Sequence, residues 1–545
     1  MLQDDIKRFF KGDVAVDEET RNKYSRDTSI FVVKPTAVVF PKDVEDLENL
    51  VEFVNVRRDV KQNLSLTARA AGSDMSGGPL TDSIVVEFTK YFNRIKKMEA
   101  DYAIVEPGVF YRDFEVDAAK RGVFFPPYPA SKQLCAMGGI VANNAAGEKT
   151  LAYGKTEQYV EELKAVLSDG QEYAFGPLTK DGLKRKMLLE TFEGEVYRKI
   201  YKLIEDNYDA IQNARPHVSK NSAGYYLWNV WDRKTFDLSK LFVGSQGTLG
   251  LITEARLKLV PKKKHSRLAV VFMKDLSPLA RLVNTVLEFH PESFESYDDK
   301  TLKLAIKFLP DLVRILKSGF FSLALKFLPE FWMVLTGGFP KLVLLIELTG
   351  DDEKEISSRF AKLVTALKAY KVKVRVTKSE AEAEKYWTIR RESFNLLRKR
   401  VRGKQTAPFI DDIVVRPEKL PEFLPELNKI LDAYQDKMFY TIAGHVGDGN
   451  FHIIPLMNLS DPAVRAVIPK LSDEVYNLVF KYGGSMTAEH NDGLIRSPYL
   501  KKMYGEKIYG LFEEVKNIFD PRNIFNPGKK VGASLQYALD HIKTG

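Results

Sequence analysis

The sequence predicts an α+β protein with two or more domains. At 545 residues the chain is longer than a single hydrophobic core usually serves. Residues 342–348 read as a buried strand, 353–369 as an amphipathic helix and 372–376 as an alternating strand. This strand–helix–strand order, with a further strand at 413–415, is typical of an α+β domain. The first half of the chain is marked instead by three loops of small residues.

The first small-residue loop follows two predicted strands near the N-terminus. Residues 38–41 read as a strand, Asp43 opens a helical pattern, and 64–69 read as the next strand. The loop that follows has little side-chain bulk, so its backbone N–H groups can approach a diphosphate closely. A surface turn is the alternative, because the spacing matches neither a Walker loop nor a GxGxxG turn. The candidate residues are Ala71, Gly72, Ser73, Asp74, Met75, Ser76 and Gly77.

Two more loops of this kind follow. Residues 126–131 and 137–147 are rich in proline, glycine, alanine and asparagine, and residues 244–254 run from a glycine-rich loop into a β-branched strand. A wall of backbone and small side chains is what a flat ring system needs in order to pack against protein. Three such loops in one half of the chain are hard to explain as ordinary turns.

Two short strings near the C-terminus carry the candidate chemistry. His445 and His452 flank a Gly-Asp-Gly-Asn turn, and Glu489 is followed directly by His490. Two histidines and a carboxylate form a ligand set that zinc and similar divalent metals accept. His490 would then remain available as a base near neutral pH. The alternative is a set of capped turns in which Asp and Asn bond to local backbone amides.

Composition and charge exclude several classes of protein. The formal net charge is +9, but Lys and Arg are spread along the chain, so we expect no nucleic-acid partner. The single Cys135 excludes an internal disulfide and a self-contained iron–sulfur cluster. The acidic start of the chain is no secretory signal, and no apolar run is long enough to span a membrane. We therefore expect a cytoplasmic protein.

Residues 301–340 stand out as an apolar and basic insertion. Lys303, Lys307, Arg314 and Lys317 recur at near-helical spacing among Leu, Ile and Phe, with Pro310 between them. A cationic amphipathic helix beside aromatic residues is typical of a helix on a membrane surface, here the inner face. A packing face of the second domain or a partner interface is the alternative.

The order of these motifs resembles a known family. The three loops resemble the flavin-binding domain of the vanillyl-alcohol-oxidase and p-cresol-methylhydroxylase superfamily. The C-terminal strings resemble its D-2-hydroxyacid dehydrogenase branch, which includes D-lactate and D-2-hydroxyglutarate dehydrogenases and the glycolate oxidase flavoprotein subunit. Further matches are Val105–Gly108, Lys220–Tyr225 and Asp520–Lys529, and the likeness covers about residues 30–260 and 380–530.

The resemblance implies a domain plan and an FAD site. Residues 1–262 would form an FAD-binding domain of two α+β subdomains, 263–484 a cap or substrate domain, and 485–545 a segment that returns to the flavin. The first loop would hold the pyrophosphate. Some members attach FAD covalently through His or Cys, but Cys135 lies where related sequences often carry an unlinked residue, so we expect non-covalent FAD. The other flavin-lining residues implied are Ser131, Gly138, Gly139, Asn143, Gly147, Gly247, Gly250 and Ile252.

The resemblance also implies a reaction. His445, His452 and Glu489 match the ligands of a divalent metal (zinc, or manganese or iron), and His490 matches the proposed base. Arg390 falls where the branch binds the substrate carboxylate, a task that its planar fork suits, although a charge on a helix surface is the alternative. The expected reaction is metal-assisted oxidation of a D-2-hydroxyacid, with hydride passing to flavin N5.

Departures from the family pattern leave substrate and acceptor open. Many relatives read Glu-His-Gly where this chain has Glu489-His490-Asn491, and Ile454 stands where they have a polar residue. The run Asp492–Ser497 is similar to relatives that work with an iron–sulfur module, so we expect a separate iron–sulfur subunit as acceptor, ahead of quinone or a soluble carrier. Three alternatives stay open: a flavin-dependent transferase like alkyl-dihydroxyacetonephosphate synthase, a metallohydrolase built on the His/His/Glu site, and a flavin that only relays electrons within a complex.

Overall fold

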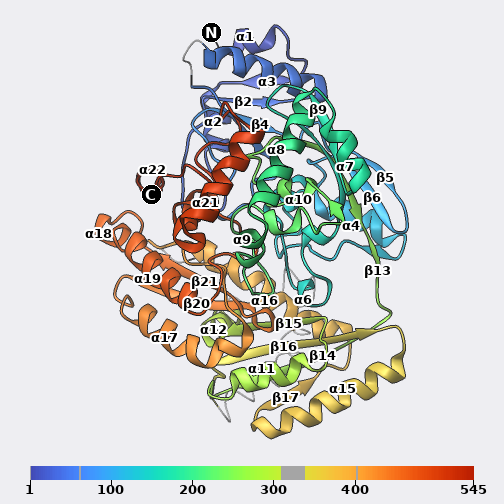
Figure 1. The fold of residues 1–545 in the computed structure, drawn as a ribbon. Helices are drawn as coiled ribbons and strands as arrows, with labels where there is room; N and C mark the ends of the chain where they lie inside the picture. The colour runs from blue at the N-terminus through green and yellow to red at the C-terminus, as the bar shows by residue number, and fades with distance from the viewer. Residues whose placement is uncertain (1, 60–62, 308–337, 401–402, 545) are drawn as a thin grey trace.

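The computed structural model describes residues 2–59, 63–307, 338–400 and 403–544. It consists of an N-terminal body, which contains a four-stranded and a five-stranded sheet, and a lower body built on one eight-stranded sheet (Figure 1). Two further pairs of short strands complete the sheets of the described residues. The proposed membrane or partner helix at 301–340 falls mostly on residues outside this description, which leaves out 308–337. No helix in the described ranges combines the length and the apolar character that crossing a membrane requires.

The first sheet of the N-terminal body has the strand order β1-β2-β4-β3, in which β1 covers Asp13–Ala15. Its central pairs, β2 (Ala37–Phe40) with β4 (Ile84–Glu87) and β4 with β3 (Leu66–Arg69), are parallel. Parallel pairs need a crossover connection, and α3 (Val44–Asp59) supplies one between β2 and β3. The predicted strands at 38–41 and 64–69 and the helix after Asp43 are thereby confirmed.

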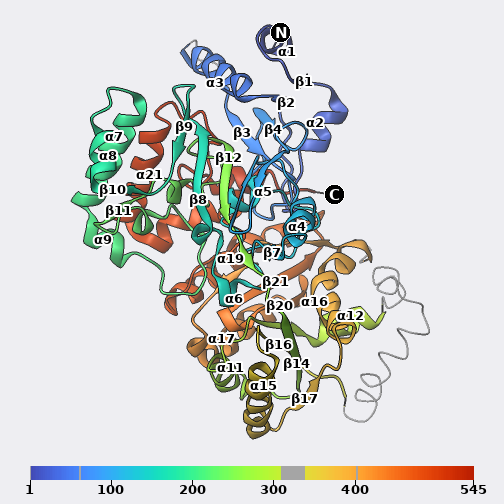
Figure 2. The same cartoon turned by 90° about the vertical axis from the view of Figure 1, so that its right-hand side faces the viewer.

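The second sheet is antiparallel, with the order β5-β6-β12-β8-β9. Its central strand β12 (Leu251–Lys258) begins where the third small-residue loop ends, as predicted. Beside the sheet packs α5 (Met137–Asn143), which contains the glycine run of the second loop. The long helix α21 (Leu500–Phe519) packs into the same core from the far end of the sequence, as Figure 2 also shows. The remaining strands are β5 (Ile95–Met98), β6 (Tyr102–Val105), β8 (Val160–Val166) and β9 (Glu172–Phe175).

The lower body is an eight-stranded sheet with both faces covered. The order is β17-β14-β16-β15-β20-β21-β18, and β19 also pairs with β21. The predicted strand–helix–strand unit is confirmed as β16 (Leu342–Gly350), α15 (Glu353–Leu367) and β17 (Lys373–Val376). Because successive side chains alternate, Leu344 and Ile346 pack towards α15, whereas Val343 and Leu345 pack against Tyr386 on the opposite face. The other strands are β14 (His265–Met273), β15 (Ser293–Asp298), β18 (Gln405–Thr406), β19 (Ile413–Val414), β20 (Met438–His445) and β21 (Asn450–Met457).

That opposite face carries α16 (Glu380–Arg400) and α12 (Asp299–Lys307), which contact each other. The segment Ser485–Arg496 leaves the lower body and contacts the small-residue loops of the N-terminal body. Asn526 then ties those loops together, because its side-chain amide donates to Gly78 O (3.0 Å) and Gln246 O (2.7 Å). The junction of the two bodies is therefore built from three distant parts of the sequence.

Candidate active site

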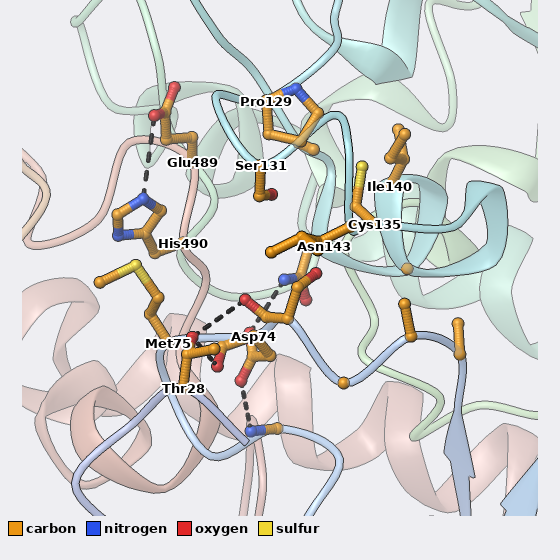
Figure 3. A pocket seen from close by; sticks show the side chains of 18 of the residues that line it. Thr28, Asp74, Met75, Pro129, Ser131, Cys135, Ile140, Asn143, Glu489 and His490 are labelled. Carbon is orange, nitrogen blue, oxygen red and sulfur yellow. Dashed lines mark hydrogen bonds and ion pairs between the residues drawn. The ribbon is translucent and has the colours of Figure 1, made fainter. Parts of the chain in front are cut away.

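A cavity of about 450 Å³ lies at the junction of the two bodies. One part of its wall comes from the three small-residue loops, and another comes from α16, β20, β21 and the 489–490 segment. Figure 3 shows Ser131, Cys135 and Asn143 facing Glu489 and His490 across it. The predicted flavin residues that line it are Ala71, Gly72, Ser73, Asp74, Met75, Ser131, Gly138, Gly139, Asn143, Gly247, Gly250 and Ile252.

Three of the predicted flavin residues lie behind the wall. Ser76 is fully buried, and its hydroxyl donates to Asp74. Gly77 adopts a left-handed conformation with φ +83°, which turns the loop. At Gly147 an added Cβ would lie 2.0 Å from the carbonyl oxygen of Tyr128, so this glycine permits a close backbone approach. The structure thus gives these positions a role in shaping the loops.

The Asp74 carboxylate organises the first loop from within. Its Oδ2 accepts the backbone N–H groups of Ser76 (3.0 Å) and Gly78 (2.8 Å). Its Oδ1 accepts the side-chain amide of Asn143 (2.9 Å), which joins the loop to the end of α5. Sequence reasoning treated Asp74 as one more loop residue, whereas its carboxylate holds the first and second loops together.

The glycine wall fits a flat ring system. A Cβ added to Gly139 would meet only the Ala70 Cβ, at 3.8 Å, so the space before this glycine belongs to the cavity. Cys135 lines the same cavity, and burial raises the pKa of its thiol to about 12. A thiol held protonated is a poor nucleophile, which favours a cofactor held without a covalent bond.

The predicted metal ligands converge on one point. β20 ends at His445 and β21 begins at Asn450, so the tight turn between these strands brings His445 and His452 to the same end of the hairpin. The Nε2 atoms of these histidines lie 3.2 Å and 3.4 Å from the same oxygen, Oε1 of Glu489. All three side chains are buried, and two imidazole nitrogens with one carboxylate suit a divalent metal.

Two carboxylates that sequence reasoning missed support these histidines. Glu295 in β15 lies 2.6 Å from His445 Nδ1, and Asp411 lies 3.1 Å from His452 Nδ1. Contacts at Nδ1 leave each Nε2 directed at Glu489, the arrangement that orients a metal-binding imidazole. The Asp411-Asp412 pair before a predicted strand was the one signal available in the sequence. Glu295 offered none, because only strand pairing brings it to His445.

Buried charge keeps Glu489 ionised. Burial opposes ionisation, but His445 and Lys220 outweigh it and hold the pKa of Glu489 well below its usual range. The Nζ atom of the fully buried Lys220 is 3.5 Å from Glu489 Oε2 and 3.1 Å from Asp448 Oδ2. The site therefore has a permanent positive charge behind the carboxylate that a metal would use.

A second grouping of ligand atoms overlaps the first. Asp412, His452, Glu489 and His490 each bring one such atom within 4.8 Å of the others. Asp412 is already saturated, however, since its Oδ2 accepts the backbone N–H groups of residues 488, 489 and 490 at 2.8–2.9 Å. We therefore consider Asp412 the anchor of the 488–490 segment, and His445 the better third ligand.

His490 lines the cavity beside the predicted metal site. Its ring stacks on His452 with a centroid distance of 5.0 Å, and its Nδ1 lies 2.9 Å from Asp411 Oδ2. Burial opposes protonation, but the carboxylates of Asp412 and Asp411 outweigh it and raise the pKa of His490 above its ordinary value. In its neutral form this imidazole, which is 20% exposed and has carboxylates behind it, is placed to accept a proton from a molecule in the cavity.

Arg390 projects from α16 into the cavity wall and is no solvated surface charge. Its side chain is 11% exposed, and Nη2 lies 3.1 Å from Glu295 Oε2. The same carboxylate thus contacts both Arg390 and His445. The neighbouring Arg391 also lines the cavity, and its guanidinium pairs with the buried Glu148 at 2.6 Å.

Comparison with known proteins finds matches over most of the chain. Residues 35–176 match the model described as FAD binding domain, and residues 262–530 match FAD linked oxidases, C-terminal domain. D-2-hydroxyglutarate dehydrogenase of Pseudomonas putida is 29% identical over 95% of this chain and 50% of its own length. Glycolate oxidase subunit GlcD of Bacillus subtilis is 27% identical over 93% of this chain and 91% of its own.

The chain spans about half the length of the first curated relatives that it matches. Among solved structures, p-cresol methylhydroxylase with substrate bound has a TM-score of 0.66 at 15% identity, over 95% of this chain and 93% of that one. At this identity the match shows the fold, which is the two-domain flavin-binding arrangement expected from the sequence.

Proposed function

The chain belongs to the FAD-linked oxidases, and from that premise we propose that it oxidises a D-2-hydroxyacid to the 2-oxoacid. The observation that carries the proposal is that Arg390, His490, His452 and Glu489 line one side of a cavity whose other side is formed by the small-residue loops. His445 lies behind this lining, in contact with Glu489 at 3.2 Å. Relatives named for 2-hydroxyglutarate and glycolate support the substrate class. Lactate belongs to the same class.

FAD would lie without a covalent bond against the loops at 71–78, 131–147 and 247–252, and its isoalloxazine would accept the hydride. A divalent metal held by His445, His452 and Glu489 would lower the pKa of the substrate hydroxyl. In this proposal residues 1–262 would supply the flavin site, and residues 263–484 would supply Arg390 and the two histidine ligands. Residues 485–545 would supply Glu489 and the base His490.

The chain's own residues would bind the substrate and move its proton. Arg390 would pair with the substrate carboxylate and fix which hydrogen at C2 faces the glycine wall. His490 would accept the hydroxyl proton through its Nε2, while Asp411 at Nδ1 stabilises the imidazolium that forms. The two electrons and the C2 hydrogen leave as hydride, so the hydroxyacid becomes the oxoacid.

The reduced flavin needs an acceptor, which we propose is a separate iron–sulfur subunit, with quinone as the second candidate. One cysteine cannot hold a cluster, and one relative is itself named as a subunit. A cytoplasmic location, with peripheral contact at the inner face of the membrane, completes the proposal.

The test is anaerobic bleaching of the flavin in purified protein by a panel of D- and L-2-hydroxyacids, with and without a chelator. We expect one D-acid to bleach it and the chelator to prevent this. His490→Gln should retain FAD and slow reduction by about 10²- to 10⁴-fold, because it removes the proton acceptor. His265→Gln, at the start of β14, is the matched control and should react normally. A yellow protein that no hydroxyacid reduces would disprove the proposed function.

A further inference from the structure

Asn491, the residue after His490, occupies a backbone conformation that few residues adopt. Its φ is +67°, in the left-handed region where glycine and asparagine are the residues best tolerated. Its side chain is fully buried, and every hydrogen-bonding group of the amide is used. Nδ2 donates to Asn143 O (3.1 Å) and to Gly244 O (2.9 Å), and Oδ1 accepts the N–H of Asp492 (2.7 Å).

The two carbonyls belong to the second and third small-residue loops. Asn143 ends α5 and lines the cavity, and Gly244 opens the loop whose Gln246 and Gly247 line it too. The Asn491 amide therefore connects the segment that carries His490 to the second and third small-residue loops. These two loops line the cavity where FAD would bind, and we call them the flavin wall.

His490 is held on its other side by the lower body. Its backbone N–H donates to Asp412 Oδ2 at 2.8 Å, next to β19. His490 thus lies between two fixed points of the chain. On one side Asp412 of the lower body holds its backbone N–H, and on the other the Asn491 amide bonds to the small-residue loops. We propose, on the basis of the proposed function, that Asn491 is a positioning residue that fixes His490 at the correct distance from the flavin wall.

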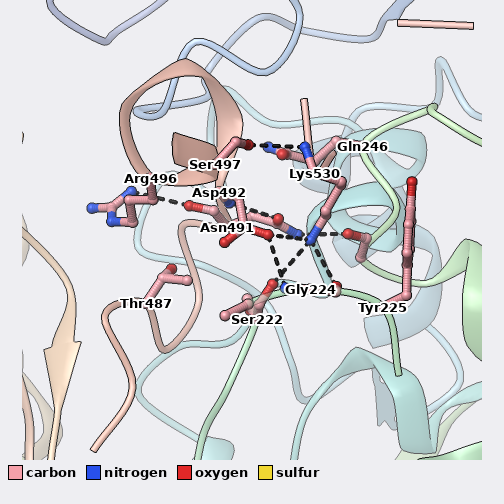
Figure 4. Close-up of polar contacts among 12 residues, drawn as sticks. Ser222, Gly224, Tyr225, Gln246, Thr487, Asn491, Asp492, Arg496, Ser497 and Lys530 are labelled. Carbon is pink, nitrogen blue, oxygen red and sulfur yellow. Dashed lines mark hydrogen bonds and ion pairs between the residues drawn. The ribbon is translucent and has the colours of Figure 1, made fainter. Parts of the chain in front are cut away.

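The residues after Asn491 are secured separately, as Figure 4 shows. Asp492 pairs with the buried Lys530 at 2.7 Å and accepts the N–H of Gly224 at 2.9 Å. Gly493 N donates to Gln246 Oε1 at 2.8 Å. Removing the Asn491 amide therefore leaves the segment attached on both sides and frees the peptide between residues 490 and 492.

Two substitutions separate the backbone role from the bridging role. Asn491→Gly keeps the left-handed conformation but leaves two buried carbonyls without their donor. Asn491→Asp also tolerates the conformation but directs a carboxylate at those carbonyls. Asn523→Gly is the matched control, because Asn523 is an exposed asparagine with φ +50°.

The measurement is stopped-flow reduction of the bound flavin by the D-acid that bleaches the wild type. We expect Asn491→Gly to keep FAD and metal and to lower the thermal midpoint slightly, because two buried carbonyls lose their donor. The limiting rate should fall about 10- to 100-fold, since a displacement of about 1 Å can cost 10²-fold. The substrate Kd should change less than about twofold, because Arg390 is untouched. Asn491→Asp should be slower still, and Asn523→Gly should equal the wild type.

The outcomes that overturn the inference differ from those that overturn the proposed function. A wild-type limiting rate in Asn491→Gly would remove the positioning role alone. Loss of FAD from Asn491→Gly would overturn it in favour of a role in holding the flavin loops. A wild-type protein that no 2-hydroxyacid reduces would defeat the proposed function, and the inference with it.

Discussion

At the residue scale, one buried carboxylate serves two of the proposed tasks. Glu295 contacts His445 Nδ1 through one oxygen and the Arg390 guanidinium through the other. Burial opposes its ionisation, but His445 and Arg390 outweigh it and lower the pKa of the carboxyl. Glu295 therefore couples the orientation of a proposed metal ligand to that of the proposed substrate arginine.

We expect Glu295→Gln to weaken metal retention by about 10- to 100-fold, the usual effect of removing such a support. The KM for the hydroxyacid should rise as well, since the arginine loses its partner. Metal content after dialysis against graded chelator, measured by mass spectrometry, checks the first effect. Glu193→Gln, which alters another buried and ion-paired glutamate far from the cavity, should retain metal as the wild type does. Equal retention in both variants would exclude the support role.

At the element scale, α5 contains a glycine, Gly139, whose missing side chain leaves space for a ligand and is not required for packing within the protein. A side chain at Gly139 would have room within the protein but would enter the cavity. The same helix ends at Asn143, which joins the Asp74 carboxylate and the Asn491 amide. A short helix thus connects the glycine wall to both neighbouring loops.

We expect Gly139→Ala to weaken FAD binding about tenfold or more, because one extra methyl in a packed site costs about 1–3 kcal/mol. The thermal midpoint of the apoprotein should not fall. Titration of apoprotein with FAD, followed by flavin fluorescence, measures the Kd. Gly510→Ala is the control, since a Cβ there meets nothing within 4 Å. Unchanged FAD affinity in Gly139→Ala would argue against a ring at this wall.

The sequence predicts those features that depend on residues near one another in the chain, and it does not predict those that depend on contacts between distant residues. The strand at 342–348 and the helix at 353–369 could be predicted because apolar periodicity is a local property. The role of Glu295 could not, because it follows from the pairing of Ser296 with Gly444, nearly 150 positions away. Asn491 showed only as a departure from a family pattern, and its backbone conformation is visible only in the structure.

At the scale of the whole molecule, buried ion pairs join the two bodies. Glu148 from the N-terminal body pairs with Arg391 of α16. Lys149 pairs with Glu292, just before β15, and with Glu347 of β16. Burial opposes ionisation of Glu148, but Arg391 outweighs it and lowers the pKa of this carboxyl from 4.5 to about 2. The interface beside the cavity therefore depends on the negative charge of Glu148, which is lost when this carboxylate is protonated at low pH.

Because the pKa of Glu148 is lowered in the folded protein, the stability of the protein should fall as the pH falls. A carboxyl whose pKa is lower in the folded state stabilises the fold above the unfolded value of 4.5, and this contribution is lost as pH falls towards 2. The full contribution is about 3 kcal/mol, at about 1.36 kcal/mol for each tenfold change in proton affinity. We expect the difference in unfolding free energy between wild type and Glu148→Gln to be constant above about pH 5 and to shrink below it.

Urea unfolding between pH 3 and pH 7 measures this difference. Glu384→Gln is a stringent control, because Glu384 pairs with the same Arg391 at 3.2 Å but is 54% exposed. It should change stability by less than about 1 kcal/mol at every pH, as exposed pairs do. A pH-independent difference for Glu148→Gln would show that the interface does not depend on this charge.

The clamp formed by Asn526 has a consequence for how the protein is made. Its amide holds loops that the ribosome completes early, at Gly78 and Gln246, and Thr67 Oγ1 donates to its Oδ1. A nascent chain that has emerged as far as residue 519 has both loops and the Gln246–Ser76 hydrogen bond between them (3.1 Å), but it lacks the Asn526 amide that bonds to both. We therefore expect firm FAD binding only after the last part of the site has been synthesised, so that a yellow colour would distinguish finished molecules from truncated ones.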